Sequence, residues 1–256
     1  MKIIIGIFSF IFGACIASFC GVVSSRVPKG ESINRPASHC VACNHKLSWY
    51  ENIPILSYIF LGGKCKNCKA KIPIFYFLLE VIGGLSFLAL YLVFGFTLEY
   101  FIGILLTILF LIIAGIDYDT HDIYDITTII FGVISIIYVV TKSILTKTVP
   151  YNEFIGAVGG FIVFYLIRFI SMRVYKQEAL GLGDVLLVLV AGFLLGYLKL
   201  ILAILFASLL ASILELSLIA LKKKNRESEI AFGPYLLFGF GFSFIFGDLI
   251  FNLLLL

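Results

Sequence analysis

The sequence predicts an all-α polytopic membrane protein with about eight transmembrane helices and a small polar insert. Of its 256 residues, 61% are hydrophobic and 13% are charged, whereas soluble domains carry about 25% charged residues. Its mean hydropathy is +1.12. Its apolar runs reach about 20 residues, the length of a helix that crosses a bilayer. These observations exclude a disordered chain, a soluble single domain and a small disulfide-rich secreted protein.

Eight apolar segments account for most of the chain, at approximately 3–25, 74–95, 98–116, 125–141, 153–171, 182–198, 200–221 and 233–254. We interpret the first as a retained span rather than a signal peptide, because no clear Ala-x-Ala cleavage site precedes Arg26. The expected organisation is a first transmembrane helix at 1–25, a cytoplasmic zinc-binding insert at 26–72 and a seven-helix membrane core at 73–256.

The basic residues predict the orientation of these spans. The segment 26–72 carries eight of the 19 Lys and Arg residues. Two later loops on the same side carry Arg168, Arg173, Lys176, Lys222, Lys223, Lys224 and Arg226. Loops rich in Lys and Arg lie on the cytoplasmic side, so we expect both termini outside. Because these charges lie between spans, the net charge of +4 does not indicate a nucleic-acid partner.

Four cysteines predict a metal site in the insert. Two C-x2-C pairs are separated by 21 residues, and their members are Cys40, Cys43, Cys65 and Cys68. Two such knuckles converge on one tetrahedral Zn²⁺ in many small domains, and the metal supplies folding energy that a short insert lacks. Two disulfides are the alternative, which a reducing compartment disfavours. His39 and His45 flank the first knuckle and are alternative ligands.

Acidic residues beside apolar spans are the candidates for chemistry, because ionisable groups are costly in a bilayer. Asp117 directly follows the third apolar segment, and Asp119, Asp122 and Asp125 come soon after it. A solvated turn or a divalent-cation site also fits most of these acids. Asp117 differs from the others in its position at the end of an uninterrupted helix.

A second candidate lies at the start of the sixth apolar segment, which opens with Gly181-Leu182-Gly183-Asp184. Glycines let the backbone bend and let another chain approach closely. With the N-terminus outside, Asp117 and Asp184 reach the same depth on the cytoplasmic side. Two neighbouring carboxylates share one proton, so one can activate water while the other protonates a leaving amine.

The ordered motifs of the whole chain resemble those of the type IV prepilin peptidase family of Gly-x-Gly-Asp membrane aspartic peptidases. The first part shares Ala17, Ser18, Phe19, Arg26, Pro28, Pro36, Ser38, Cys40, Cys43, Trp49, Asn52, Pro54, Gly63, Cys65, Cys68, Tyr76 and Glu80. The later part shares Ile116, Asp117, Ile123, Asp125, Gly181, Gly183, Asp184, Phe232, Gly233, Pro234 and Tyr235. The departures are Gly21, Val41, Phe75, Phe77 and Tyr124.

This resemblance implies a multi-pass protein of the bacterial cytoplasmic (inner) membrane that cleaves pilin-like precursor proteins with a short basic leader. It implies that Asp117 and Asp184 are catalytic, with Gly181, Gly183 and Asp125 in support. It also implies that the enzyme methylates the new N-terminal amine with S-adenosylmethionine. The sequence itself contains no glycine fingerprint of a nucleotide site, so the methyl donor rests on the family resemblance and on the long insert, which shorter peptidase-only members of the family lack.

Several alternatives stay open at this point. Asp125 competes with Asp117 as the partner of Asp184, or serves as a helix N-cap. Glu80 binds the basic leader, or pairs with Lys71 or Arg26. Glu215 and Asp248 are expected to meet polar partners inside the bundle. A cation or proton transporter and a zinc-knuckle assembly scaffold are the alternative functions.

Overall fold

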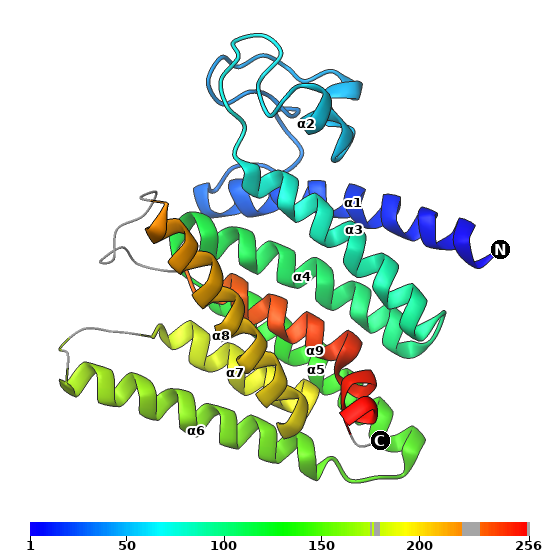
Figure 1. Ribbon diagram of the computed structural model, residues 1–256, viewed down its shortest axis with the longest axis vertical. Helices are drawn as coiled ribbons and strands as arrows, with labels where there is room; N and C mark the ends of the chain where they lie inside the picture. The colour runs from blue at the N-terminus through cyan, green and yellow to red at the C-terminus, as the bar shows by residue number, and fades with distance from the viewer. Residues whose placement is uncertain (175, 177–179, 222–230, 255–256) are drawn as a thin grey trace. The chain divides into compact units, whose positions relative to one another are not determined.

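The computed structural model describes residues 1–174, 176, 180–221 and 231–254 (Figure 1). Its long helices are α1 (Lys2–Arg26), α3 (Ile74–Phe94), α4 (Leu98–Thr120), α5 (Asp125–Thr146), α6 (Tyr151–Val174), α7 (Leu182–Leu195), α8 (Tyr197–Ala220) and α9 (Gly233–Leu254). The insert contains the short helix α2 (Leu56–Phe60) and two 3₁₀ turns, η1 (Val27–Lys29) and η2 (Trp49–Asn52). Within the described residues there is no β-strand, only two isolated bridges, so the all-α prediction is confirmed.

Seven of the described helices are long and apolar enough to cross a membrane. The eighth, α7, has 14 residues and is therefore about 21 Å long, shorter than the ~30 Å hydrocarbon core. The expected boundary near residue 198 is wrong, because Gly196 adopts a φ of +76° and ends α7 early. In contrast, α4 continues four residues beyond its expected end, so Asp117 lies inside its last turn.

The described chain groups into two compact units, Met1–Asp119 and Thr120–Leu256. The expected division at residues 25 and 72 stays a prediction. So does the cytoplasmic placement of the basic loops, and four of their residues, Lys222, Lys223, Lys224 and Arg226, lie outside the described residues.

In the first unit, α1 and α3 pack closely (Figure 1). A Cβ added to Gly13 of α1 would lie 2.7 Å from the carbonyl oxygen of Gly83 in α3, so only glycine fits there. A core of buried side chains extends from this contact to α4 and contains Ala17, Cys20, Leu79 and Leu111. Small residues let membrane helices approach each other in this way.

In the second unit, α7 packs against α5 and α6, while α8 packs against α9. A Cβ on Gly156 of α6 would lie 2.7 Å from the carbonyl oxygen of Gly192 in α7. On α9, Gly239 faces Ala203 and Ala207 of α8 in a similarly close contact. Val185 of α7 is fully buried. The residues that follow Asp184 are therefore fixed from more than one side.

We expect Gly156→Ala to lower the thermal midpoint of the detergent-solubilised protein, because the added methyl group meets backbone atoms of α7. Overpacking of this kind costs about 1–3 kcal/mol. Gly159 is the matched control on the same helix, since nothing lies within 4 Å of its added Cβ. Gly159→Ala should leave the midpoint unchanged or raise it, because alanine favours helix. Circular dichroism measures the thermal midpoint of each variant. An equal fall in the midpoint of both variants would contradict the close α6–α7 contact.

Candidate active site and metal centre

The two cysteine pairs of the insert lie in loops of the same construction. The backbone N–H of Cys40 donates to the carbonyl of His45 at 2.9 Å, and that of Cys65 donates to the carbonyl of Ala70 at 2.8 Å. In each loop the residue directly after the second cysteine has a positive φ, 54° in the first loop and 60° in the second. Each loop thereby folds back and presents two thiols to the same side.

The four thiols form one compact cluster. All four Sγ atoms lie within 4.8 Å of one another. The Cys40–Cys68 sulfur distance is 3.8 Å and the Cys43–Cys65 distance is 3.9 Å. A tetrahedral ion with metal–sulfur bonds of about 2.3 Å requires sulfurs about 3.8 Å apart. All four are free thiols rather than disulfides, and their geometry fits a tetrahedral thiolate metal site.

The electrostatics of the cluster also favour a bound cation. A backbone hydrogen bond from His45 lowers the pKa of the Cys43 thiol. For Cys68, the backbone hydrogen bond at Ala70 lowers the pKa, but contacts with the neighbouring sulfurs and partial desolvation raise it to about 11. Crowded thiols cannot all ionise without compensation, and a divalent cation among them supplies that compensation.

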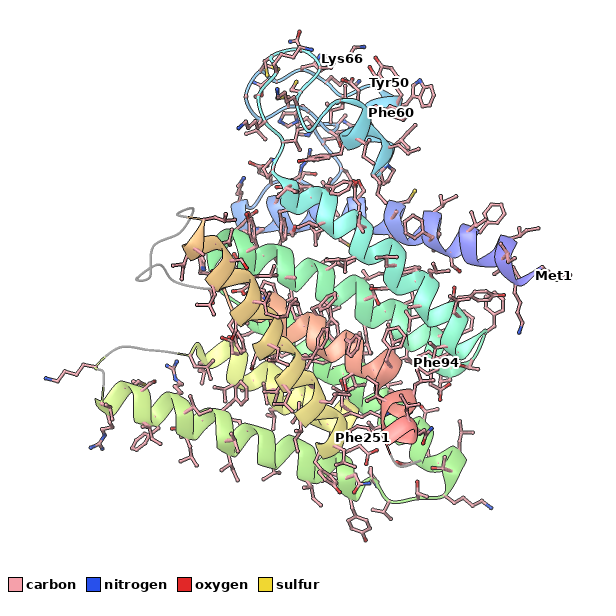
Figure 2. All side chains as sticks on the ribbon, viewed as in Figure 1. Met1, Tyr50, Phe60, Lys66, Phe94 and Phe251 are labelled. Atoms are coloured by element: carbon pink, nitrogen blue, oxygen red, sulfur yellow. The ribbon has the colours of Figure 1, made fainter. Side chains whose placement is uncertain are left out.

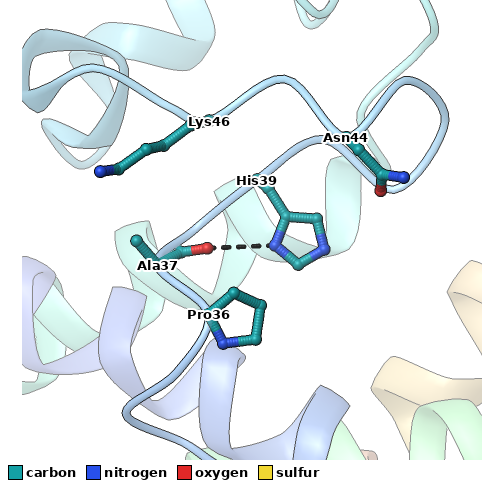
Figure 3. Close-up of a pocket in the computed structure, with 5 residues that line it drawn as sticks. All are labelled: Pro36, Ala37, His39, Asn44 and Lys46. Atoms are coloured by element: carbon teal, nitrogen blue, oxygen red, sulfur yellow. Dashed lines mark hydrogen bonds between the residues drawn. The ribbon is translucent and has the colours of Figure 1, made fainter.

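The two histidines beside the first knuckle have partners of their own. The Nδ1 atom of His39 lies 3.0 Å from the carbonyl oxygen of Ala37 (Figure 3). The Nε2 atom of His45 lies 3.4 Å from Glu51 Oε2. A pocket of about 440 Å³ beside this loop is lined by Pro36, Ala37, His39, Asn44 and Lys46 (Figure 3). With four sulfurs already clustered, the site needs neither imidazole.

Glu51 is a structural residue of the insert that sequence reasoning missed. Its carboxylate accepts the backbone N–H of Ser48 at 2.8 Å, and the two residues form a reciprocal capping box on η2. This hydrogen bond, and then the contact with His45, lower the pKa of Glu51. The Ser-x-x-Glu spacing of a capping box was the signal in the sequence that identifies this role.

Asp117 lies in the last turn of α4 and is 4% exposed. The neighbouring Gly115 packs against Ser24 near the end of α1. On its other side, the ring of Tyr118 stacks on Phe75 of α3 with centroids 4.0 Å apart. These contacts pack the last turn of α4 against the end of α1 and the start of α3, the two points between which the insert lies.

Asp184 is the third residue of α7 and is 8% exposed. Gly181 occupies the N-cap position with extended backbone. A Cβ on Gly183 would lie 2.8 Å from the Cβ of Ile123, so a side chain there would push the helix away from the loop before α5. The second glycine of the motif therefore serves close packing, which the sequence alone did not specify.

The remaining acids near α5 are exposed. Asp125 is the first residue of α5 and Tyr124 holds the N-cap position, so the N-cap interpretation of Asp125 is wrong. Asp122 is exposed in the preceding loop. Burial therefore separates Asp117 and Asp184 from these neighbours. Asp117 belongs to the first unit and Asp184 to the second, and their pairing stays a prediction.

Glu80 has a defined contact within the first unit. Its Oε2 accepts the backbone N–H of Ile55 at 2.7 Å, in a residue whose φ is +64°. Arg26, which was considered as its partner, instead donates to the carbonyl of Ser32 at 2.9 Å. Glu80 thus attaches the insert to the second turn of α3, and its expected role in binding substrate stays a prediction.

Glu215 and Asp248 have polar partners, as expected, but the Asp248 side chain is 69% exposed and does not lie inside the bundle. Glu215 of α8 accepts the hydroxyl of Tyr235 of α9 at 3.0 Å. Asp248 of α9 accepts the ammonium of Lys199 of α8 at 2.6 Å. Both pairs connect the same two helices, so they stabilise the contact between α8 and α9.

These features define a multi-pass membrane protein with a cluster of four cysteines that could bind a metal ion and two buried carboxylates at helix ends. The family model "Bacterial Peptidase A24 N-terminal domain" matches residues 11–94, and "Type IV leader peptidase family" matches residues 104–216. No solved structure matches the chain.

Curated relatives cover most of the sequence. A protein of Myxococcus xanthus named prepilin leader peptidase/N-methyltransferase is 35% identical over 87% of this chain and 66% of its own length. An Escherichia coli protein named type 4 prepilin-like proteins leader peptide-processing enzyme is 33% identical over 88% and 80%. A Bacillus subtilis protein, also named prepilin leader peptidase/N-methyltransferase, is 29% identical over 93% of this chain and 93% of its own length. The chain belongs to the type IV leader peptidase family. This confirms the resemblance seen in the sequence and identifies the protein as an enzyme.

We expect the purified protein to contain about one divalent metal ion per chain, because four sulfurs complete one tetrahedral site. Elemental analysis should show that Cys43→Ser and Cys68→Ser remove most of this metal. Cys15, an exposed thiol in α1, supplies the control, and Cys15→Ser should retain the metal. Full metal content in the Cys68→Ser variant would contradict a four-thiolate site.

Proposed function

We propose that this protein is a membrane aspartic endopeptidase that removes the short basic leader of type IV prepilin-like precursors. The observation that carries the proposal is the burial of Asp117 and Asp184 at the ends of apolar helices. Ionisable groups in such positions are costly and are retained for function. Membership of the leader peptidase family indicates the reaction that they perform. Neither a transporter nor a scaffold gains support from the relatives.

In the proposed reaction, Asp117 and Asp184 share one proton when the substrate is bound, because two adjacent carboxylates resist double ionisation. The ionised member takes a proton from water, whose oxygen attacks the carbonyl carbon of the scissile peptide bond. The protonated member gives its proton to the leaving nitrogen as the C–N bond breaks. The products are a leader with a carboxyl terminus and a mature protein with a free amine.

Three neighbouring residues support this reaction in the proposal. Gly183 supports it by allowing the contact with Ile123 that positions the start of α7. A Cβ on Gly181 would lie 3.5 Å from Asp184 Oδ2, so glycine keeps a side chain away from that oxygen. Asp125 lies at the start of α5, and as an exposed group it serves the electrostatics of the site rather than the proton transfer.

The proposed reaction takes place at the cytoplasmic face of the bacterial inner membrane. The basic loops support this orientation through the distribution of Lys and Arg. A substrate with a basic leader followed by an apolar helix would then place its cleavage site at the membrane surface, where the helix ends that carry the two acids are expected.

We further propose that the metal of the insert is Zn²⁺ with a structural role. Zinc prefers tetrahedral thiolate ligands, and four protein ligands leave no open position for a substrate. When bound, the ion supplies folding energy to a segment with few buried apolar side chains. Its removal should loosen the insert, and with it the contact between Ile55 and Glu80.

The names of the relatives also support a second activity, transfer of a methyl group from S-adenosylmethionine to the new N-terminal amine. When bound, S-adenosylmethionine would supply an electrophilic methyl group to this amine. The residues that would bind the methyl donor are not assigned.

For the peptidase, we expect Asp117→Asn and Asp184→Asn each to lower cleavage of a purified prepilin-like precursor by about 100-fold or more, because each removes a proton-transfer group. Asp122→Asn, a change to an exposed neighbour, is the matched control and should retain activity. Asp125→Asn tests the rival assignment. Full loss with Asp125→Asn and normal cleavage with Asp117→Asn would replace Asp117 by Asp125 in the dyad.

For the methyltransferase, we expect the mature product to gain the mass of one methyl group only when S-adenosylmethionine is present. Mass spectrometry of the product distinguishes the two reactions. A precleaved substrate should still be methylated by Asp184→Asn, because methyl transfer does not need the hydrolytic pair. An unchanged product mass with the wild-type protein and the methyl donor would show that this chain is a peptidase alone.

A further inference from the structure

The short helix α2 presents an apolar face to its surroundings. Leu56, Ile59 and Phe60 are spaced at i, i+3 and i+4, so they lie on one side of the helix. Their exposed fractions are 50%, 57% and 82%. Five-residue helices have little stability of their own, so this helix depends on contacts that its other face makes.

The opposite face of α2 is attached to the first turns of α3. The ring of Tyr58 stacks on Phe77 with centroids 4.9 Å apart. The backbone N–H of Ile55 donates to Glu80. Because Glu80 is the seventh residue of α3, Ile55 lies beside the helix about 9 Å from its start, at 1.5 Å per residue. The insert therefore folds back along a membrane-spanning helix.

The first turns of α3, to which the opposite face of α2 is attached, carry side chains that have the character of lipid contacts. Ile74 and Leu78 lie in the first turns of this candidate span and are 61% and 44% exposed. A helix that crosses the bilayer exposes such residues to lipid. Since Ile55 and Tyr58 attach α2 to these turns of α3, the exposed apolar face of α2 lies at the same end of this candidate span.

Residues of the interfacial type lie next to this face. The 3₁₀ turn η2 contacts α2, and its Trp49 is 79% exposed. The adjacent Tyr50 accepts the ammonium of Lys66 at 2.6 Å. Figure 2 shows Tyr50 and Phe60 on the same side of the insert. Tryptophan and tyrosine concentrate at the boundary between headgroups and hydrocarbon, where a lysine ammonium reaches the phosphates.

We propose that Trp49, Leu56, Ile59 and Phe60 form a membrane-docking face that seats the metal-binding insert in the bilayer interface. The occupant of this face is lipid: the acyl boundary contacts the apolar side chains, and the headgroups contact Lys66. The proposal goes beyond the peptidase activity, and its test does not use that activity, so failure of either leaves the other unaffected.

The chain contains a single tryptophan, so intrinsic fluorescence reports on Trp49 alone. The full-length wild-type protein is reconstituted into vesicles of phosphatidylglycerol and phosphatidylcholine, with or without bromine on the acyl chains near the headgroup. We expect brominated lipid to reduce Trp49 emission by about half, since bromine quenches only on close contact and interfacial tryptophan lies at that depth.

The double variant Ile59→Ser/Phe60→Ser should lose most of this quenching. Val41→Ser is the matched control, because Val41 is an apolar insert residue that is 92% exposed and lies outside α2 and η2. It should be quenched like the wild type. Metal content is measured for each variant, and an unchanged value shows that the insert is still folded.

Two results would overturn the proposal. Equal Trp49 emission in brominated and plain vesicles would show that the face does not meet lipid. Trp49 emission that changes only when a prepilin-like precursor is added would assign the face to substrate instead of the bilayer.

Discussion

Close contact between helix backbones at small residues is the constraint on which the rest of this structure depends. In lipid, apolar side chains gain little by facing one another, so helices associate through van der Waals contact at glycine, alanine and serine. Close contacts at glycine also fix the turns of both buried acids, one against a helix and the other against a loop. Gly115 against Ser24 holds the turn of Asp117, and Gly183 against Ile123 holds the turn of Asp184. Packing and the candidate chemistry therefore use the same positions.

The sequence predicted the number and type of the helices because an apolar run of sufficient length has few other solutions in a bilayer. It did not predict where α7 ends, because several glycines lie near that end. Only the positive φ of Gly196 shows which of them ends the helix. It singled out Asp117 and Asp184 as candidates through their place beside apolar runs, and the structure buries both. Which carboxylates meet during the reaction depends on long-range packing, and no local pattern specifies this.

In the insert, local sequence spacing predicts the cysteine cluster, whereas the attachment of the insert to α3 depends on residues far apart in the chain. Cysteine spacing encodes the metal cluster because each C-x2-C loop closes over a few residues, and the four sulfurs then need only one approach. The attachment of the insert to α3 joins Ile55 and Glu80, which are 25 positions apart. The position of Glu80 in an apolar run suggested substrate binding, and the structure shows that its carboxylate accepts a hydrogen bond from the backbone N–H of Ile55. An acid near a membrane surface thus needs its local contacts before its role is assigned.

The 14-residue length of α7 affects how close water lies to Asp184. An apolar helix shorter than the hydrocarbon layer can be accommodated by local thinning of the bilayer, by flanking residues that reach the interface, or by association with other helices. Thinning brings headgroups and their hydration shell closer to both ends of the helix, and Asp184 lies in its first turn. Water is the second substrate of the proposed hydrolysis, and a short α7 would bring hydrated headgroups closer to Asp184.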